Sequence, residues 1–175
     1  MRIATLSVAF VLACSCAPSR PPPPIAATGS APSRADDRRD AAQVLDAWHA
    51  AAARADEEAY FSAFATGGVF IGTDATERWD VPAFRAYAHP RFAKGKAWTF
   101  RATRRAVESR GHVVWFDEDL ATERLGPARG SGVLVREGGT LKIAHYVLSL
   151  SIPNERFADV RRALGEPPAP APDAP

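Results

Sequence analysis

The sequence predicts an α+β fold: a cone-shaped, curved, largely antiparallel sheet packed against three helices from the N-terminal half, with a short C-terminal helix. Apolar residues recur at three- and four-residue spacing before residue 90 and at two-residue spacing after residue 97. These are the periods of helices and of half-buried strands. Helices grouped before a run of antiparallel strands are typical of the α+β class. Because three helices lie on one curved face, we expect a pocket inside the cone.

The first half of the chain is expected to hold three helices and one short strand. Ser33 and Asp36 have the spacing of a helix-capping pair, and Gly67-Gly68 separates the second helix from the strand. Pro90 is expected to end the third helix, because proline disfavours helical conformation in the preceding residue. The expected helices cover residues 36–54, 57–65 and the stretch from Asp80 to Pro90, and the strand covers residues 69–72.

The second half is expected to form four consecutive antiparallel strands and a closing helix. Turn residues separate stretches of two-residue periodicity, which is the pattern of a meander. The strands are expected over residues 97–108, 112–122, 128–136 and 141–151. Asn154 is expected to cap the last helix, and Gly165 is expected to end it.

Four regions are expected along the chain. Residues 1–13 have the short positive start and apolar stretch of a signal peptide, too short to span a bilayer. Residues 14–34 and 166–175 are rich in proline and alanine, and we expect a solvated tether and a disordered tail. Residues 35–165 are left for one folded domain, which is long enough to form a core without disulfides.

The junction after the signal peptide resembles a bacterial lipobox. Val11-Leu12-Ala13-Cys14 places an aliphatic residue at −3 and a small residue at −1 before the cysteine. This resemblance implies that Cys14 carries lipid, including palmitate, and anchors the domain to a bacterial membrane outside the cytoplasm, on the periplasmic side. The alternative is ordinary secretion with cleavage near Ala17.

Several classes of ligand are not supported by the sequence. The net charge is +2 with no block of five like charges, so nothing indicates nucleic acid. Cys14 and Cys16 are the only cysteines and the four histidines are widely spaced, so no metal site is expected. There is no phosphate-binding loop and no Gly-x-Ser-x-Gly motif, and we expect no cofactor.

The order of elements and two stretches of sequence resemble a known family. Val69 to Asp74 with Glu77-x-Trp79, and Leu141 to Tyr146 followed by Pro153-Asn154-Glu155, are similar to SnoaL-like domains of the nuclear transport factor 2-like superfamily, over residues 38–157. Leu141 stands where family members often have tryptophan. The resemblance implies the cone-shaped fold and frequent homodimers. It leaves function open, because the superfamily contains isomerases, dehydratases, cyclases and non-catalytic binding modules.

Strand alternation selects three candidate catalytic residues. In the last strand His145 shares a face with Leu141, Ile143, Val147 and Ser149, which we interpret as a pocket wall, and its imidazole can exchange a proton near neutral pH. Asp117 and Glu118 point to opposite faces, and Glu118 is preferred because it alternates with apolar residues. Among aromatic neighbours its pKa would be raised, as suits a general base. The alternatives are a core histidine and an acidic strand edge.

Seven further residues are candidates for ligand binding. They are polar or aromatic side chains expected near the cone or its mouth: Asp74, Trp79, Tyr87, Trp115, Arg129, Ser131 and Ser149. Each has a structural alternative: Asp74 can cap its own turn, the aromatic rings can be core, and Arg129 can pair with Glu118 or Asp117. Gly130 and Gly132 lie within a strand, where glycine allows close backbone approach or a bulge.

Three functions remain open. The first is a membrane-tethered binding module that holds a small, largely apolar ligand or a partner in the cone without catalysis. The second is a small isomerase or dehydratase that uses a carboxylate and His145 as an acid–base pair. The third is a dimeric structural part, because the exposed face of the sheet can take up a second copy of the chain.

Overall fold

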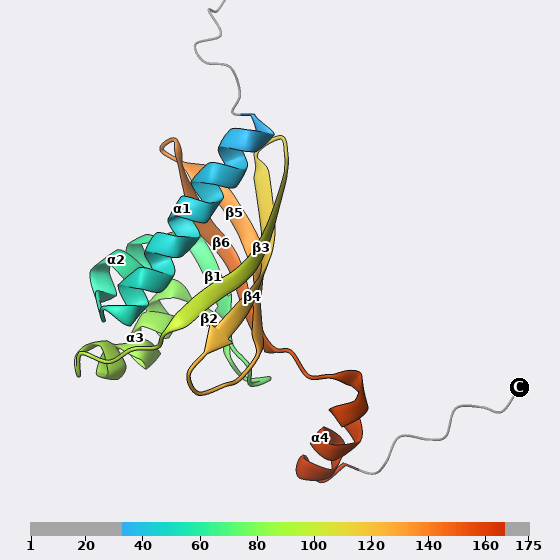
Figure 1. The fold of residues 1–175 in the computed structure, drawn as a ribbon. Helices are drawn as coiled ribbons and strands as arrows, with labels where there is room; N and C mark the ends of the chain where they lie inside the picture. Colours follow the sequence, from blue (N-terminus) through green and yellow to red (C-terminus); the bar gives the residue numbers. More distant parts are fainter. Residues whose placement is uncertain (1–32, 167–175) are drawn as a thin grey trace, which may run out of the picture. The chain divides into compact units, whose positions relative to one another are not determined.

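The computed structural model of the 175-residue chain describes residues 33–166. The predicted signal peptide, Cys14 and nearly all of the predicted tether and tail lie outside these residues. The elements follow in the order α1 (Arg34–Ala53), α2 (Glu57–Ser62), β1 (Phe64–Ile71), β2 (Arg78–Asp80), α3 (Val81–Phe92), β3 (Phe100–Arg110), β4 (Val113–Thr122), β5 (Ala128–Glu137), β6 (Thr140–Leu150), the 3-10 turn η1 (Asn154–Arg156) and α4 (Phe157–Ala163) (Figure 1).

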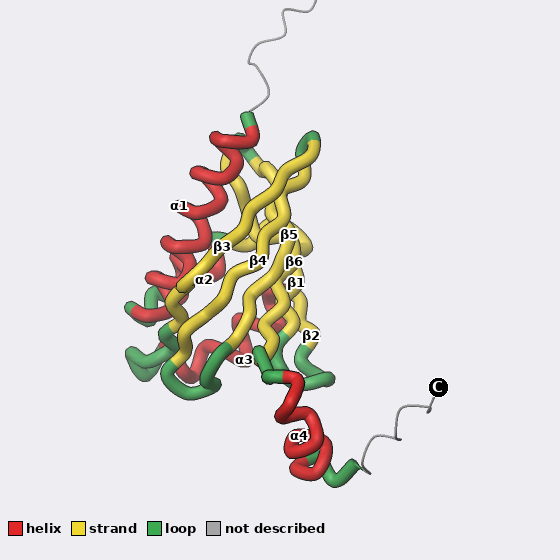
Figure 2. The backbone as a smooth tube through the Cα atoms, turned by 45° about the vertical axis from the view of Figure 1, so that its right-hand side comes forward, coloured by secondary structure: helices red, strands yellow, loops and turns green. Residues whose placement is uncertain are grey.

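One six-stranded sheet carries the fold, in the order β2-β1-β6-β5-β4-β3. The last four strands form the predicted antiparallel meander, while β1 joins β6 in parallel and β2 joins β1 in antiparallel register. Helices α1, α2 and α3 lie on one side of the sheet (Figure 2). We call the opposite side of the sheet the outer face. The predicted α+β class is therefore confirmed.

Helix α1 begins as the sequence predicts. The Ser33 side chain accepts from the backbone of Asp36, and the Asp36 carboxylate accepts from Ser33, which is a complete capping box. Ala41, Leu45 and Trp48 recur at three- and four-residue spacing and are all buried against the sheet. The apolar stripe of this helix therefore supplies one wall of the cone.

Three local expectations are wrong. Gly67 and Gly68 do not end α2 but lie inside β1, where the pairing with β6 shifts and Gly67 has a φ of +72° that favours glycine. Pro90 does not end α3, which continues to Phe92 because Pro90 lies on the exposed side, where the carbonyl it leaves unbonded can reach water. Asn154 makes no capping hydrogen bond.

A bulge in β6 reverses the face of its second half. Val133 pairs with His145 but Leu134 pairs with Ile143, so Ala144 is an extra residue. Ile143 is buried before the bulge and Tyr146 after it. The expectation that His145 shares a face with Leu141 and Ile143 is therefore wrong, and His145 lies on the outer face.

Aromatic rings fill the inside of the cone. Ring centroids lie 4.6 Å apart for Trp48 and Tyr146, 4.9 Å for Trp48 and Tyr60, and 4.0 Å for Phe70 and Phe84. Such separations are those of packed aromatic pairs. The open hollow expected from the sequence is thus closed by side chains in this structure.

Gly130 makes room for the innermost ring. A methyl group at this position would overlap the Tyr146 hydroxyl and lie 3.0 Å from Oε1 of Glu118.

We predict that Gly130→Ala lowers the free energy of unfolding by about 1–3 kcal/mol, because overpacking a filled core forces side chains apart. In a Tyr146→Phe background the same substitution should cost less, since the hydroxyl is gone. Urea unfolding of the four proteins measures this coupling, and strictly additive effects would contradict it.

Candidate functional site

A buried carboxylate lies at the centre of the cone. Glu118 alternates on β4 with Phe116 and Leu120, which are both buried, and its own side chain is 0% exposed. The preference for Glu118 over Asp117 as the inward residue is confirmed. A buried charge is stable only when partners compensate for the lost water.

Three side chains from three elements bind the Glu118 carboxylate. His49 Nε2 of α1 lies 2.6 Å from Oε1, and the Tyr146 hydroxyl of β6 donates to the same oxygen at 3.2 Å. Arg105 of β3 donates from Nε to Oε2 at 2.8 Å. The guanidinium of Arg105 also donates to Asp46, which is exposed, so it links the buried carboxylate to the surface.

These partners keep Glu118 ionised. Burial opposes the charge, but the hydrogen bond from His49 and the attraction of His49 and Arg105 outweigh it and lower the pKa of Glu118 below its ordinary value. The expectation of a raised pKa is therefore wrong. A carboxylate with a lowered pKa and both oxygens engaged is a weak general base.

Two other buried polar atoms near this network have no hydrogen-bond partner within the described part of the chain. They are the indole Nε1 of Trp48 and the hydroxyl of Tyr60. Burial raises the pKa of Tyr60 well above its usual value and outweighs the smaller lowering effect of the Trp98 indole, which can only donate to the Tyr60 oxygen, so the hydroxyl keeps its proton. Both atoms are therefore buried hydrogen-bond donors without an acceptor, which costs about 1–3 kcal/mol each.

Six of the predicted site residues lie on the outer face or its edge. Trp115 pairs with Val133 in the same row of the sheet as His145, and no acidic partner of His145 is among the described contacts. The remaining outer residues are charged or hydroxyl side chains: Asp117, Arg129, Ser131 and Ser149. The structure therefore does not bring His145 and Glu118 together, because the sheet lies between them.

Arg129 has a different partner from the two predicted. It lies 3.6 Å from Asp119, which also accepts from Arg104 at 2.7 Å. Asp117 lies 3.2 Å from Arg104. All of these side chains are well exposed, so this is a solvated ion-pair network of small energetic weight.

The remaining candidates take their structural alternatives. Asp74 accepts from the backbone and the hydroxyl of Thr76 and so caps its own turn. Trp79 stacks on Phe84 at 5.5 Å and on Tyr87 at 4.5 Å. Trp79 and Tyr87 thus extend the aromatic core toward the surface near β2.

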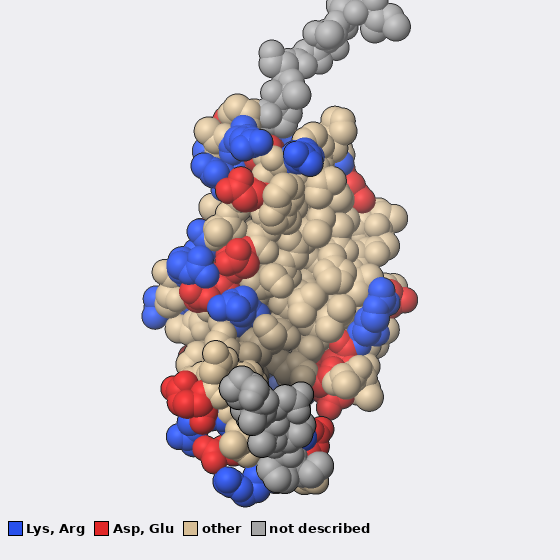
Figure 3. All heavy atoms as spheres, turned by 90° about the vertical axis from the view of Figure 1, so that its right-hand side faces the viewer, with Lys and Arg blue, Asp and Glu red and all other residues tan. Residues whose placement is uncertain are grey.

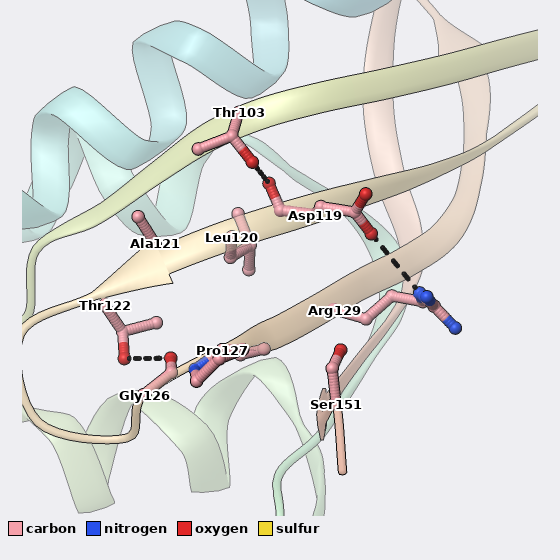
Figure 4. A pocket seen from close by; sticks show the side chains of 10 residues that line it. Thr103, Asp119, Leu120, Ala121, Thr122, Gly126, Pro127, Arg129 and Ser151 are labelled. Carbon is pink, nitrogen blue, oxygen red and sulfur yellow. Dashed lines mark hydrogen bonds and ion pairs between the residues drawn. The ribbon is translucent and has the colours of Figure 1, made fainter. Parts of the chain in front are cut away.

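Two open surface pockets in the described part of the chain lie outside the cone. The larger, of about 610 Å³, lies at the ends of β4 and β5, with Asp119, Arg129 and Ser151 at its rim and Leu120 and Pro127 among its apolar lining (Figure 4). The smaller, of about 390 Å³, lies where Arg105 reaches the surface between α1 and β3. Neither is lined by Glu118.

Residues 33–166 contain neither a metal-binding cluster nor a helix able to cross a membrane. No group of three or more His, Cys, Asp or Glu side chains there could hold a metal ion. None of the helices between these residues combines the length and apolar character needed to cross a membrane.

Sequence reasoning missed His49, Arg105, Tyr146, Trp48 and Tyr60. His49 follows Trp48 in α1 and is buried. Its contact with Glu118 could not be predicted, because 69 residues separate the two in the sequence. The bulge at Ala144, which strand periodicity does not reveal, turns Tyr146 toward the inside of the cone. The only signal in the sequence was Gly130, whose missing side chain leaves room for a bulky inward neighbour.

Comparisons with known proteins agree with this fold. A family model described as a SnoaL-like domain matches residues 41–153. A putative dehydratase of the NTF2-like family from Streptomyces avermitilis is 15% identical, with a TM-score of 0.58 over 69% of this chain and 100% of that one. A protein of unknown function from Mycobacterium tuberculosis is 19% identical, with a TM-score of 0.59 over 74% of this chain and 85% of that one.

An NTF2-like protein of unknown function from Pseudomonas putida KT2440 is 14% identical, with a TM-score of 0.56 over 67% of this chain and 88% of that one. No curated protein is significantly similar to the chain. At these identities the solved structures support the fold alone.

Glu118 provides the test of this site. We predict that Glu118→Gln lowers the free energy of unfolding by about 3–5 kcal/mol at pH 7, because it leaves Arg105 and His49 buried against a neutral group. The pKa of Glu118 is lowered on folding, so its contribution is complete above the ordinary value of 4.5 and is lost as pH falls through the lower folded value. The variant should therefore lose stability less steeply in acid.

Urea unfolding between pH 7 and pH 3 measures both effects. The matched control is Asp117→Asn on the outer face, which should change stability little because its ion pair with Arg104 is exposed. Equal losses in the two variants would contradict a buried, charged Glu118.

Proposed function

Because the chain belongs to the SnoaL-like domain family, we propose that it is a non-catalytic binding module that holds a small, largely apolar ligand in its cone, tethered outside the cytoplasm to a bacterial membrane. Members of this family often bind ligands or act as isomerases or dehydratases, and the family alone does not choose among these functions. The choice rests on the polar atoms inside the cone.

The observation that carries the proposal is the pair of unpartnered donors, Trp48 Nε1 and the Tyr60 hydroxyl. Buried donors without acceptors are rare in folded proteins, because each loses its hydrogen bonds to water. An apolar ligand that carries an acceptor, such as a planar ketone, would supply a partner for a donor of this kind and stack on the surrounding rings. The interior is closed around those rings, so entry requires side chains to move apart.

The same interior argues against catalysis. An acid–base pair needs both groups within reach of one substrate atom. His145 lies on the outer face, and both oxygens of Glu118 are already engaged. Glu118 therefore holds together the elements that line the binding site, and the ligand supplies the acceptor for the unpartnered donors.

An isomerase or dehydratase is the second candidate, and one observation favours it. Glu118 has a different histidine, His49, at 2.6 Å inside the cone. Such a pair could exchange protons with a substrate if Arg105 moved away. The two functions differ in turnover: an enzyme converts a bound ketone or hydroxy compound, whereas a binding module returns it unchanged.

The remaining parts of the proposal concern location and assembly. The lipobox-like Val11 to Cys14 supports lipidation of Cys14, with palmitate among its acyl chains, and anchoring on the periplasmic side of a membrane. Val113 and Trp115 are exposed on the outer face, and Figure 3 shows a broad uncharged area over this face; both support a homodimer through the sheet.

Tyr60→Phe tests the ligand site, because stability without ligand and affinity for the ligand are expected to respond differently to the loss of the hydroxyl. Without ligand the variant should be as stable as the parent or more stable by about 1 kcal/mol, because an unpaired buried hydroxyl is removed. Binding of 2-acetylnaphthalene, an apolar planar ketone, should weaken by about five- to tenfold, since one donor is lost. Thermal unfolding and calorimetric titration measure the two effects.

Tyr87→Phe is the matched control, because Tyr87 lies at the surface and should change neither quantity. Native mass spectrometry of the protein from its own host should in addition reveal a co-purifying small molecule. A Tyr60→Phe protein that is less stable without ligand but binds the ketone normally would contradict the proposed site.

Cys14→Ser tests the anchor. The substituted chain should lose incorporation of labelled palmitate, because Cys14 is the lipobox position and Cys16 lies two residues beyond it. Cys16→Ser is the control and should keep the incorporation. Palmitate incorporation that survives Cys14→Ser would refute Cys14 as the anchor.

A further inference from the structure

Helix α4 presents an apolar face that nothing in the described chain covers fully. Phe157, Val160 and Leu164 recur at three- and four-residue spacing and so lie on one side of the helix. Phe157 is 49% exposed and Leu164 is 70% exposed, the highest value among the large apolar residues of the described chain. The main packing partner of α4 is the adjoining turn η1. Exposed apolar side chains grouped in this way mark an interaction site.

The charges around this face indicate a protein partner. Residues 154–166 carry three acidic and three basic side chains, and Asp159 pairs with both Arg156 and Arg162. A helix that binds an anionic membrane is rich in lysine and arginine on its polar side. An apolar centre with a mixed, balanced rim is instead the anatomy of a protein interface.

The outer face of the sheet carries a second exposed apolar surface. Trp115 is 43% exposed and Val113 is 45% exposed, and they pair across the sheet with Val133 and Val135. Figure 3 shows a broad uncharged area over this face, with charged side chains toward its margins. We call these four residues the tryptophan patch.

Helix α4 does not lie on the tryptophan patch of its own chain. It extends beyond the Ser151 end of the sheet (Figures 1 and 2), whereas Trp115 lies in the row of His145, six residues earlier and about 20 Å back along the strand. Its apolar face, with Phe157 and Leu164 exposed, is therefore left without a partner in its own chain.

A two-fold axis would place α4 of one copy over the tryptophan patch of a second copy. An axis perpendicular to the strands near Val147 and Ser131 would face two outer surfaces together and bring the Ser151 end of one sheet over the Trp115 end of the other. Val147 and Ser131 pair with each other, and their row lies about midway between the row of His145 and Ser151. The arrangement is isologous, so each copy supplies one helix and receives one.

We propose that α4 of one chain packs its Phe157, Val160 and Leu164 face on the tryptophan patch of a second copy, and that two such exchanged contacts hold the homodimer together. This inference rests on the proposed homodimer and adds the element that seals it. One seven-residue helix is small against the roughly 800 Å² per partner of a stable interface, so both helices and the sheet between them are needed.

Cysteine cross-linking in intact cells tests the exchange. In a Cys16→Ser background, chains with Trp115→Cys alone and chains with Leu164→Cys alone are co-expressed and oxidised briefly. The matched control replaces Trp115→Cys by Ser62→Cys, which is exposed on α2 on the helix side of the sheet. The first pair should give on the order of tenfold more disulfide-linked dimer than the control, because proximity raises the effective thiol concentration.

Two results would overturn the exchange. One is equal dimer yield from the two pairs. The other is an internal disulfide in the double variant carrying both Trp115→Cys and Leu164→Cys with no linked dimer, since that places α4 on its own sheet. Val147→Cys alone reports separately on the homodimer: cross-linking there without α4 cross-linking keeps the dimer and removes only the helix exchange.

Discussion

The constraint on which the structure depends is the charge of Glu118 at the centre of the cone. A carboxylate without water needs donors, and they must come from elements that the chain keeps far apart. Helix α1 supplies His49, β3 supplies Arg105, and β6 supplies Tyr146. The interaction therefore fixes how the first helix lies across the sheet, and any element that shifts leaves a buried charge without a partner.

This arrangement gives the two faces of the sheet different properties. Inside, aromatic rings and a satisfied carboxylate surround two donors that lack an acceptor, Trp48 Nε1 and the Tyr60 hydroxyl. Outside, Trp115 and Val113 are exposed beside a solvated network of ion pairs. We infer that the inner face of the sheet binds a small molecule and that the outer face binds a second copy of the chain. The bulge at Ala144 decides which residues of β6 lie on each face.

Sequence periodicity predicted the order of elements and the class of fold, because helix and strand periods are local properties. It also predicted that Glu118 points inward, since Phe116 and Leu120 flank it at two-residue spacing. It failed for His145, because one extra residue in a strand moves all later side chains to the other face. Periodicity could not predict the partners of Glu118, because only the tertiary fold brings α1 and β3 together around it.

The ionisation of Glu118 tests the account most directly. Carbon-13 NMR of a protein labelled at the glutamate side-chain carboxyl carbons follows each residue through its titration, and Glu118→Gln identifies the signal. The account predicts that this carbon titrates below the ordinary glutamate pKa of 4.5, because His49 and Arg105 favour the charged form over the opposing effect of burial. A midpoint above that value would mean that burial dominates, and that Glu118 is neutral and available as an acid within the cone.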